Sequence, residues 1–260
     1  MEAKHLLLWV SVTNHGHWPD MYETIKNKVK PHESNEEIDR RGAEFEGNYS
    51  TILDDDYPLI LKQTTDGTVP FVLYYDGNFD LIQNGGKKLA IVGTTKSSKS
   101  GEKMVSQVIS EVTKVDVVVV SYQKGIATVA LKEALKKGIK TIVVLNTSLK
   151  DAYEKDTEGL LKQAVEQDGL VITEYPEGTI WKPELVRWSL RIIASISNVI
   201  LLGEEYSRSA TSIVIGYGIN FGKDIGAIPF PAGLNSLNND LIKEGANLIQ
   251  SGQDIDDLLN

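Results

Sequence analysis

Short apolar runs rich in valine and isoleucine recur from residue 87 onward, about every 25 to 30 residues, and stretches with helical spacing separate them. Strands that are apolar on both faces must be covered by helices on both faces, so this alternation is typical of a parallel sheet. We therefore expect an α/β fold with a Rossmann-like, doubly wound, mostly parallel sheet, whose ligands bind outside the carboxyl ends of the strands. The expected strands cover 88–92, 116–122, 141–146, 169–175, 198–205 and 224–230, and the expected helices 101–114, 129–138, 157–169 and 182–197.

The chain before this pattern holds all four histidines and scattered charge. Here we expect helices over 21–30 and 35–45 and a short strand over 70–78 that ends in an Asp-Gly turn. The N-terminus reads as a helix or strand and not as a signal peptide, because no small-residue cleavage site follows its apolar run. The expected organisation is a small, mainly helical N-terminal region (1–80), a Rossmann-like core (81–250) and a C-terminal tail (251–260).

Composition excludes several classes of protein. The chain has no cysteine, so it can form neither a disulfide nor a thiolate zinc site. Its formal net charge of −9 argues against a non-specific coat for duplex DNA, although a basic pocket acts locally whatever the distant charges are. No apolar run approaches the ~20 residues that span a bilayer, so we expect a cytoplasmic protein without a membrane partner.

The stretch AIVGTTKSSKSG (90–101) predicts an anion site. A strand runs into Gly93, and a helix that begins near Gly101 would direct its free N–H groups back toward the strand end. Side chains that could donate to a phosphate lie between these glycines: Thr94, Thr95, Lys96, Ser98, Lys99 and Ser100. The alternative is an ordinary loop whose lysines face water.

Known phosphate motifs fit this stretch incompletely. Gly-x-Gly-x-x-Gly fails, because no second glycine follows Gly93 at the required spacing. The P-loop pattern is nearly matched, but Ser98 stands where its second glycine belongs. The strand over 116–122 also ends without an acidic residue for magnesium, although 173–175 and 203–205 contain glutamates. A P-loop stays an alternative.

Three further clusters have residue types that suit an anion or a nucleotide. Lys124 and Gly125 precede a helix and either contact an anion or cap a loop. Arg187 and Arg191 lie four residues apart with Trp188 between them, so they either hold and stack a nucleotide or pair with nearby acids while Trp188 joins the core. Ser207, Arg208 and Ser209 open a helix, as an anion site or as helix caps.

The sequence offers little for catalysis. There is no Gly-x-Ser-x-Gly elbow and no cysteine nucleophile. Glu174, at a strand end, is the one plausible acid or base, and no partner for it can be identified. His15 and His17 fit a surface loop better than a metal site, because no third ligand is spaced for one. We expect no catalytic residue, no metal site and no cofactor.

Taken together, these stretches resemble the DprA/Smf family of DNA-processing proteins, from about Asp56 to Leu258. Each match is weak alone, and their common order makes the resemblance specific. The matching stretches are YPLIL (57–61), PFVLYYDGN (70–78), AIVGTTKSSKSG (90–101), VSYQKGIATVALKEAL (120–135), TIVVLNTSLKDAY (141–153), TEYPEGT (173–179), SLRIIASIS (189–197), GKDIGAIPF (222–230) and LIKEGA (241–246).

The resemblance implies a Rossmann-like core that binds single-stranded DNA, forms a homodimer and loads RecA recombinase onto DNA during natural transformation, without catalysis. Carried over by position, it implies a DNA pocket lined by Gly93, Thr94, Ser98, Gly101, Lys124, Gly125, Arg191, Ser207 and Ser209. With the neighbouring basic residues, the candidate DNA contacts also include Thr95, Lys96, Lys99, Arg187 and Arg208.

The chain departs from the family pattern at several of these positions. Thr95 and Ser189 replace family arginines, and Leu131 replaces a histidine; Ala127, Leu190, Arg208 and Phe230 depart as well. Each phosphate contact that is lost weakens DNA binding. Lys96, Lys99 and Arg208 lie nearby in the sequence and are the candidates to replace the lost positive charge. Two other functions stay open: a nucleotide-binding or nucleotide-hydrolysing enzyme that uses the same crevice, and a partner-binding protein that has lost the DNA site.

Overall fold

A computed structural model describes residues 2–64, 67–206, 209–231 and 236–260. In these residues a nine-stranded sheet has the order β1-β2-β6-β5-β4-β3-β7-β8-β9. The strands are β1 (Asn48–Thr51), β2 (Val72–Gly77), β3 (Lys88–Val92), β4 (Val117–Ser121), β5 (Lys140–Val144), β6 (Leu170–Thr173), β7 (Val199–Leu202), β8 (Asp224–Ala227) and β9 (Asn247–Leu248).

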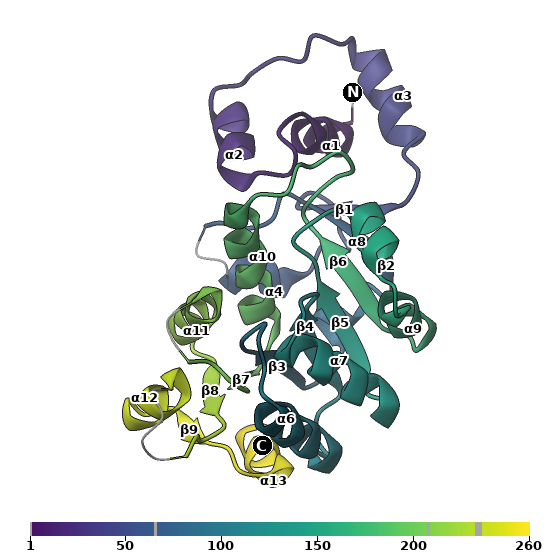
Figure 1. Cartoon of the computed structure of the whole chain (residues 1–260). Coiled ribbons are helices and arrows are strands. Elements are labelled where there is room, and N and C mark those ends of the chain that lie inside the picture. Colours follow the sequence, from purple (N-terminus) through teal and green to yellow (C-terminus); the bar gives the residue numbers. More distant parts are fainter. Residues whose placement is uncertain (1, 65–66, 207–208, 232–235) are drawn as a thin grey trace.

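Thirteen helices accompany these strands in the described part of the chain (Figure 1). They are α1 (Ala3–Thr13), α2 (Trp18–Lys26), α3 (Asn35–Ala43), α4 (Leu59–Thr64), α5 (Leu81–Asn84), α6 (Lys99–Glu111), α7 (Ile126–Lys137), α8 (Leu149–Lys155), α9 (Leu160–Glu166), α10 (Pro183–Ile196), α11 (Ala210–Asn220), α12 (Leu237–Lys243) and α13 (Gly252–Leu258).

The expected α/β fold with a mostly parallel, doubly wound sheet is confirmed. All six expected strands form, as β3 to β8, and every pairing from β6 across to β9 is parallel. β3 lies in the middle, with β4, β5 and β6 on one side and β7, β8 and β9 on the other. The chain reverses its direction of winding between β3 and β7, and in such sheets this is the point where a crevice opens at the carboxyl ends.

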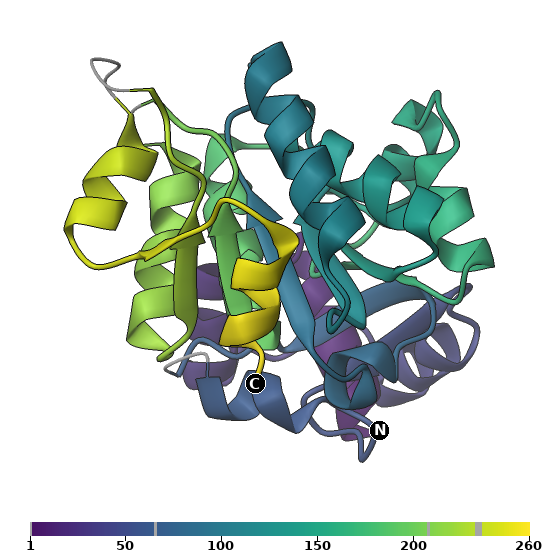
Figure 2. The same cartoon turned by 90° about the horizontal axis from the view of Figure 1, so that it is seen from below.

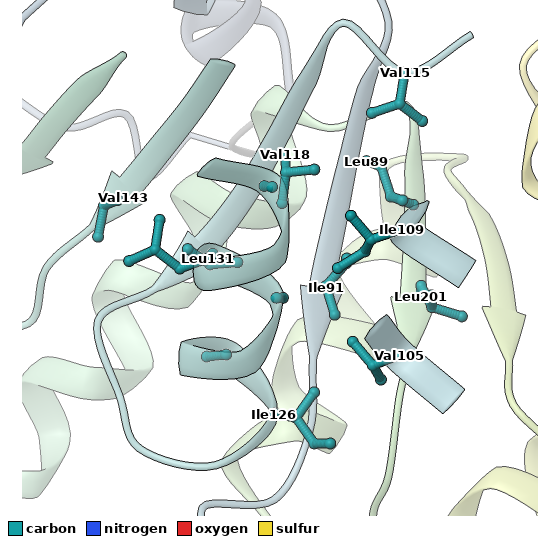
Figure 3. Packing of buried hydrophobic residues seen from close by; sticks show 14 of the residues in the cluster. Leu89, Ile91, Val105, Ile109, Val115, Val118, Ile126, Leu131, Val143 and Leu201 are labelled. Carbon is teal, nitrogen blue, oxygen red and sulfur yellow. The ribbon is translucent and has the colours of Figure 1, made fainter. Parts of the chain in front are cut away.

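Two apolar layers cover the two faces of the sheet. Side chains alternate along each strand, so that Leu89 and Ile91 of β3 face one layer and Ala90 and Val92 face the other. The first layer packs α6, α7, α9 and α13 onto the sheet. Figure 3 shows side chains of α6 and α7 against the strands, and Figure 2 shows these two helices side by side on that face. The second layer contains α10 and α11. Full burial of the β3–β5 valines explains why these strands are continuous apolar runs.

One helix forms where none was expected. The helix expected over 157–169 forms as α9, which is shorter, and the additional short helix α8 precedes it. Ser148 caps α8, accepting a hydrogen bond from the Asp151 N–H at 3.2 Å. Gly159 precedes α9 with a φ of +68°, a left-handed conformation that ends regular helix between them.

The N-terminal helices gather at one end of the molecule, and α13 lies at the other (Figure 1). A stack of aromatic rings joins the N-terminal helices to the sheet and α10: Trp18 lies 5.5 Å from Phe71 and 5.3 Å from Trp188, centroid to centroid. β1 and β2 also come from residues 1–80 and pair antiparallel at the sheet edge beside β6. Where the chain divides into separately folding units stays a prediction. No helix among the described residues is long and apolar enough to cross a membrane.

Candidate functional site

The turn between β3 and α6 has the geometry that the sequence analysis expected. β3 ends at Val92, and α6 begins after Ser98, whose hydroxyl accepts the Gly101 N–H at 3.0 Å. Thr95, Lys96 and Lys99 are exposed along this turn. The Thr94 hydroxyl accepts the Lys96 N–H at 3.1 Å, which holds the turn closed.

The anion at the start of α6 is supplied by the chain itself. Glu204 follows β7, is fully buried, and accepts the Ser98 N–H at 2.9 Å through its Oε2. The Tyr206 hydroxyl donates to its other carboxylate oxygen, and this hydrogen bond raises the pKa of Tyr206. The Thr94 N–H donates to the Glu204 carbonyl oxygen at 2.7 Å, so the β3 and β7 ends are joined twice.

This contact corrects the expected phosphate cradle. The helix dipole and N–H groups at the start of α6 favour a negative charge, and the Glu204 carboxylate already provides one. Gly101 is needed for its close approach, because a Cβ there would overlap Oε2 and lie 2.7 Å from Cδ of Glu204. The start of α6 therefore has no free position for a phosphate, and the exposed polar side chains of this turn include those of Thr95, Lys96 and Lys99. The arrangement also removes the basis of the P-loop alternative.

The β4–α7 turn lies directly against the β3–α6 turn. The Ile126 N–H donates to the Thr94 carbonyl oxygen at 3.2 Å. Gly125 has φ +76° and ψ −134°, and a Cβ on it would overlap that carbonyl oxygen and lie 2.8 Å from Cα of Thr95. Lys124, next to Gly125, is exposed. The structure thus brings together Thr94, Thr95 and Lys124, which the sequence analysis placed in one site.

A groove of about 430 Å³ begins at Lys124 and follows the carboxyl ends of β4 and β5. Its walls combine polar and charged side chains with a larger apolar surface, which includes one large exposed aromatic side chain, Trp181, just before α10. Its lining residues are Tyr122, Gln123, Lys124, Thr128, Asn146, Thr147, Ala152, Lys155, Thr157, Glu158, Leu160 and Trp181. The groove lies at the carboxyl-end edge of the sheet, where ligands of such folds bind, but beside β4 and β5 and not at the switch point between β3 and β7.

The lysine side chains at this groove have no acidic partner in the described part of the chain, whereas the carboxylates beside them already accept hydrogen bonds or form an ion pair. Lys124 and Lys155 form no ion pair with any described residue. Asp156, beside Lys155, accepts the Tyr122 hydroxyl at 2.9 Å and the Leu161 N–H at 2.7 Å. Glu158 pairs with Lys132. An anionic ligand in the groove therefore meets two free ammonium groups.

Arg191 does not belong to this surface, which corrects the expectation that it contacts DNA. It is fully buried, and its guanidinium binds both carboxylate oxygens of Glu174 at 2.5 Å. Its Nε–H also donates to the Thr68 carbonyl oxygen at 2.8 Å. Burial raises the pKa of Glu174, and the guanidinium opposes that rise. Glu174 is thus half of a structural ion pair, and its partner, which sequence reasoning did not find, is Arg191.

Arg187 and Trp188 lie away from the groove at Lys124. Arg187 is exposed one turn before Arg191 and lines a separate hollow with His17, Trp188 and Tyr217. Trp188 stacks on Trp18, so its ring is part of the packing between α10 and the N-terminal helices. Arg187 and Lys124 line different hollows, and the structure does not bring them together.

The turn after β7 caps a helix. The Ser209 hydroxyl accepts the Thr211 N–H at 3.1 Å and donates to Glu205 at 2.7 Å. Ser209 is therefore engaged as the cap of α11, the alternative that the sequence analysis left open. Ser207 and Arg208 lie outside the described residues.

His15 and His17 form no candidate metal centre in the described chain. The nearest acid to His17 is Asp20, whose Oδ2 lies 2.8 Å from its Nδ1. Among the described residues no group of three or more histidine, aspartate or glutamate side chains could hold a metal ion.

Of the residues that line the groove, only Lys124 was a candidate from the sequence; Gln123, Asn146, Lys155 and Trp181 are among those that were missed. Asn146 is the last residue of the strand expected over 141–146 and lies two residues after the end of β5, so the carboxyl-end rule alone could have named it. Lys155 ends α8, which was not expected as a helix. Trp181 is separated from Lys124 by most of two β–α units, and only the fold places both in one groove.

Comparison with known proteins decides the family. The model of the family described as DNA recombination-mediator protein A matches residues 48–260. The chain belongs to this family. A curated family relative, the DNA processing protein DprA of Streptococcus pneumoniae, is 37% identical over 209 residues, which cover 79% of this chain and 72% of that protein. Protein Smf of Synechocystis sp. is 29% identical over 233 residues, covering 87% of this chain and 56% of that protein.

Two solved structures have the same fold. The X-ray structure of DprA from Streptococcus pneumoniae matches with a TM-score of 0.75 and 29% identity, covering 98% of this chain and 97% of that one. DprA from Helicobacter pylori, described for its single-stranded DNA binding mode, matches with a TM-score of 0.68 and 21% identity, covering 82% and 96%. The expected resemblance to DprA/Smf proteins is confirmed.

Proposed function

We propose that this protein binds single-stranded DNA in the groove at the carboxyl ends of β4 and β5 and hands it to a RecA-type recombinase during DNA uptake and recombination. The observation that carries the proposal is the pair of free lysines, Lys124 and Lys155, in a groove whose carboxylates are engaged elsewhere. Membership of the recombination-mediator family supports it. The proposed action is binding without catalytic turnover, and the proposed place of action is the cytoplasm.

The groove suits a single strand for two physical reasons. A flexible backbone can follow a path between two lysines, with Lys96 and Lys99 extending that path past the β3–α6 turn. The buried Glu204 keeps a terminal nucleotide phosphate from the start of α6, which is where a mononucleotide would be held in a fold of this class. A polymer that lies across the surface does not need that position.

Oligonucleotide binding measured against salt tests the proposal. Wild-type protein and labelled oligo-dT, followed by fluorescence anisotropy, should give an affinity that falls with salt by about 0.7 log units per log unit for each phosphate contacted. Lys124→Ala and Lys155→Ala should each weaken binding and lower that slope by about 0.7. Lys136→Ala is the matched control, because Lys136 is exposed near the other end of α7 and should leave both quantities unchanged.

Three outcomes count against the proposal. No binding at micromolar protein in low salt would leave a protein that has kept the family fold and lost the site. Equal effects of Lys136→Ala and Lys124→Ala would mean that general charge, and not the groove, holds DNA. Stabilisation against heat by ATP, NAD or a nucleoside monophosphate, without oligonucleotide binding, would favour the nucleotide-binding alternative.

The assembly is a separate part of the proposal. We expect a homodimer and a direct contact with a RecA-type recombinase. Light scattering on the purified chain gives its mass in solution, and a monomer at micromolar concentration would exclude the dimer. Capture of purified recombinase by the immobilised chain, with and without oligonucleotide, tests the second contact.

A further inference from the structure

Trp181 has a surface that the proposed phosphate contacts do not explain. It is 52% exposed, and among the described residues its ring stacks on no other aromatic side chain. Trp18 and Trp188 stack together, and Trp9 donates its indole N–H to Glu33 at 3.1 Å. A large aromatic ring left open at the wall of a charged groove is the residue type on which nucleobases stack.

The groove also offers hydrogen-bonding groups that nothing else uses. Gln123 and Asn146 line it and are partly buried, and in the described chain their side-chain amides make no hydrogen bond. Amide groups both donate and accept, so they can pair with the edge of a base that has left the stack. A volume of about 430 Å³ is within the range of sites that enclose a small planar ligand.

We propose that one nucleobase of the bound strand enters this groove and stacks on Trp181, with the Gln123 and Asn146 amides available to its edge and Lys124 and Lys155 binding the flanking phosphates. This inference rests on the proposed function and adds that the site holds a base as well as backbone. Trp181 would then make the affinity depend on whether the strand carries bases, whereas a site that binds only phosphates would not distinguish oligo-dT from an abasic strand.

A double-mutant cycle between protein and DNA tests the stacking contact. One partner is Trp181→Ala, and the other is an oligonucleotide of the same length and charge in which every base is replaced by an abasic tetrahydrofuran unit. The wild type should bind oligo-dT more tightly than the abasic strand by roughly 5- to 100-fold. Trp181→Ala should lose about that factor on oligo-dT and almost nothing on the abasic strand.

Two variants separate stacking from other effects of the substitution. Trp181→Phe keeps an aromatic face and should retain most of the preference for oligo-dT. Ile180→Ala removes apolar surface from the neighbouring residue, which is 76% exposed, and should leave binding of both strands unchanged. Because Trp181 is exposed, thermal unfolding of Trp181→Ala should match the wild type.

The failures of the two proposals differ. If the wild type binds both strands with equal affinity, or if Trp181→Ala weakens both equally, DNA still binds and base stacking on Trp181 is wrong. If the wild type binds neither strand, the proposed function fails and the stacking contact with it.

Discussion

At the scale of single residues, Arg191 shows how burial changes what a basic side chain does. On the helix pattern it lies four residues from Arg187, and both could reach a ligand. In the folded chain Arg191 has no exposed surface and both of its terminal nitrogens bind Glu174, while Arg187 stays in solvent. An arginine therefore has a structural role at position 191 and is exposed to solvent at position 187.

Replacing Arg191 should destabilise the fold and not weaken a DNA contact directly. Arg191→Ala leaves the Glu174 carboxylate buried without its counter-charge, which costs about 3–5 kcal/mol. Urea denaturation measures the loss, and Arg187→Ala, on the same helix, should change stability by less than about 0.5 kcal/mol. An Arg191→Ala protein with wild-type stability and weakened oligonucleotide binding would restore the original interpretation.

At the scale of elements, the site depends on how two β–α turns fit together. The start of α7 presses on the β3–α6 turn through the backbone of Gly125, and the start of α6 is closed by Glu204 from the end of β7. Each turn is ordinary alone. Their contact is what aligns Thr95 and Lys124 along one edge of the sheet.

Gly125→Ala should therefore cost more than a typical glycine substitution. A Cβ would meet the backbone of Thr94 and Thr95, and an L-residue strains at φ +76° and ψ −134°, so we expect a loss of at least about 2 kcal/mol. Gly138→Ala is the matched control: its φ is also +76°, but no atom lies within 4 Å of the new Cβ, and about 1 kcal/mol is expected. Equal losses in urea denaturation would show that the turn contact contributes nothing.

At the scale of the whole molecule, the C-terminal helix is fastened to the first half of the core. The buried Asp256 carboxylate accepts the Thr113 N–H at 2.8 Å, the Thr113 hydroxyl at 2.6 Å and the Lys114 N–H at 3.0 Å. Burial alone would raise the pKa of Asp256, but these hydrogen bonds outweigh it and the pKa lies below the ordinary value of 3.8. The tail after residue 250 is thus part of the core packing and not an appendage.

The lowered pKa of Asp256 determines the direction in which the free energy of unfolding changes with pH. The unfolded chain takes up the proton at higher pH than the folded one, so the stabilisation is complete above pH 3.8 and is lost as the pH falls through the lower folded value. Asp256→Asn should cost about 2 kcal/mol near neutral pH, and the difference from wild type should shrink below pH 3.8. Asp257→Asn, on the exposed face of α13, is the control; a difference that persists unchanged into acid would contradict the ionic contact.

The parallel sheet and its six central strands follow from the apolar pattern of the chain alone, because valine and isoleucine runs of this length can be buried only between two helical layers. The sequence also located the carboxyl-end edge of the sheet, where we propose that DNA binds, and the turns at Gly93 and Gly125. These are local patterns, set by side-chain period and by the backbone freedom of glycine.

Which charged side chains meet depends instead on how distant elements pack together. Glu204 reaches the start of α6 from more than a hundred residues away. Glu174, which follows β6, pairs with Arg191 of α10, and Trp181 lines the same groove as Lys124. No spacing along the chain encodes these contacts, because they depend on how the elements pack across the sheet. In the folded chain the Glu204 carboxylate occupies the expected phosphate position, while Lys124, Lys155 and Trp181 remain exposed along the groove.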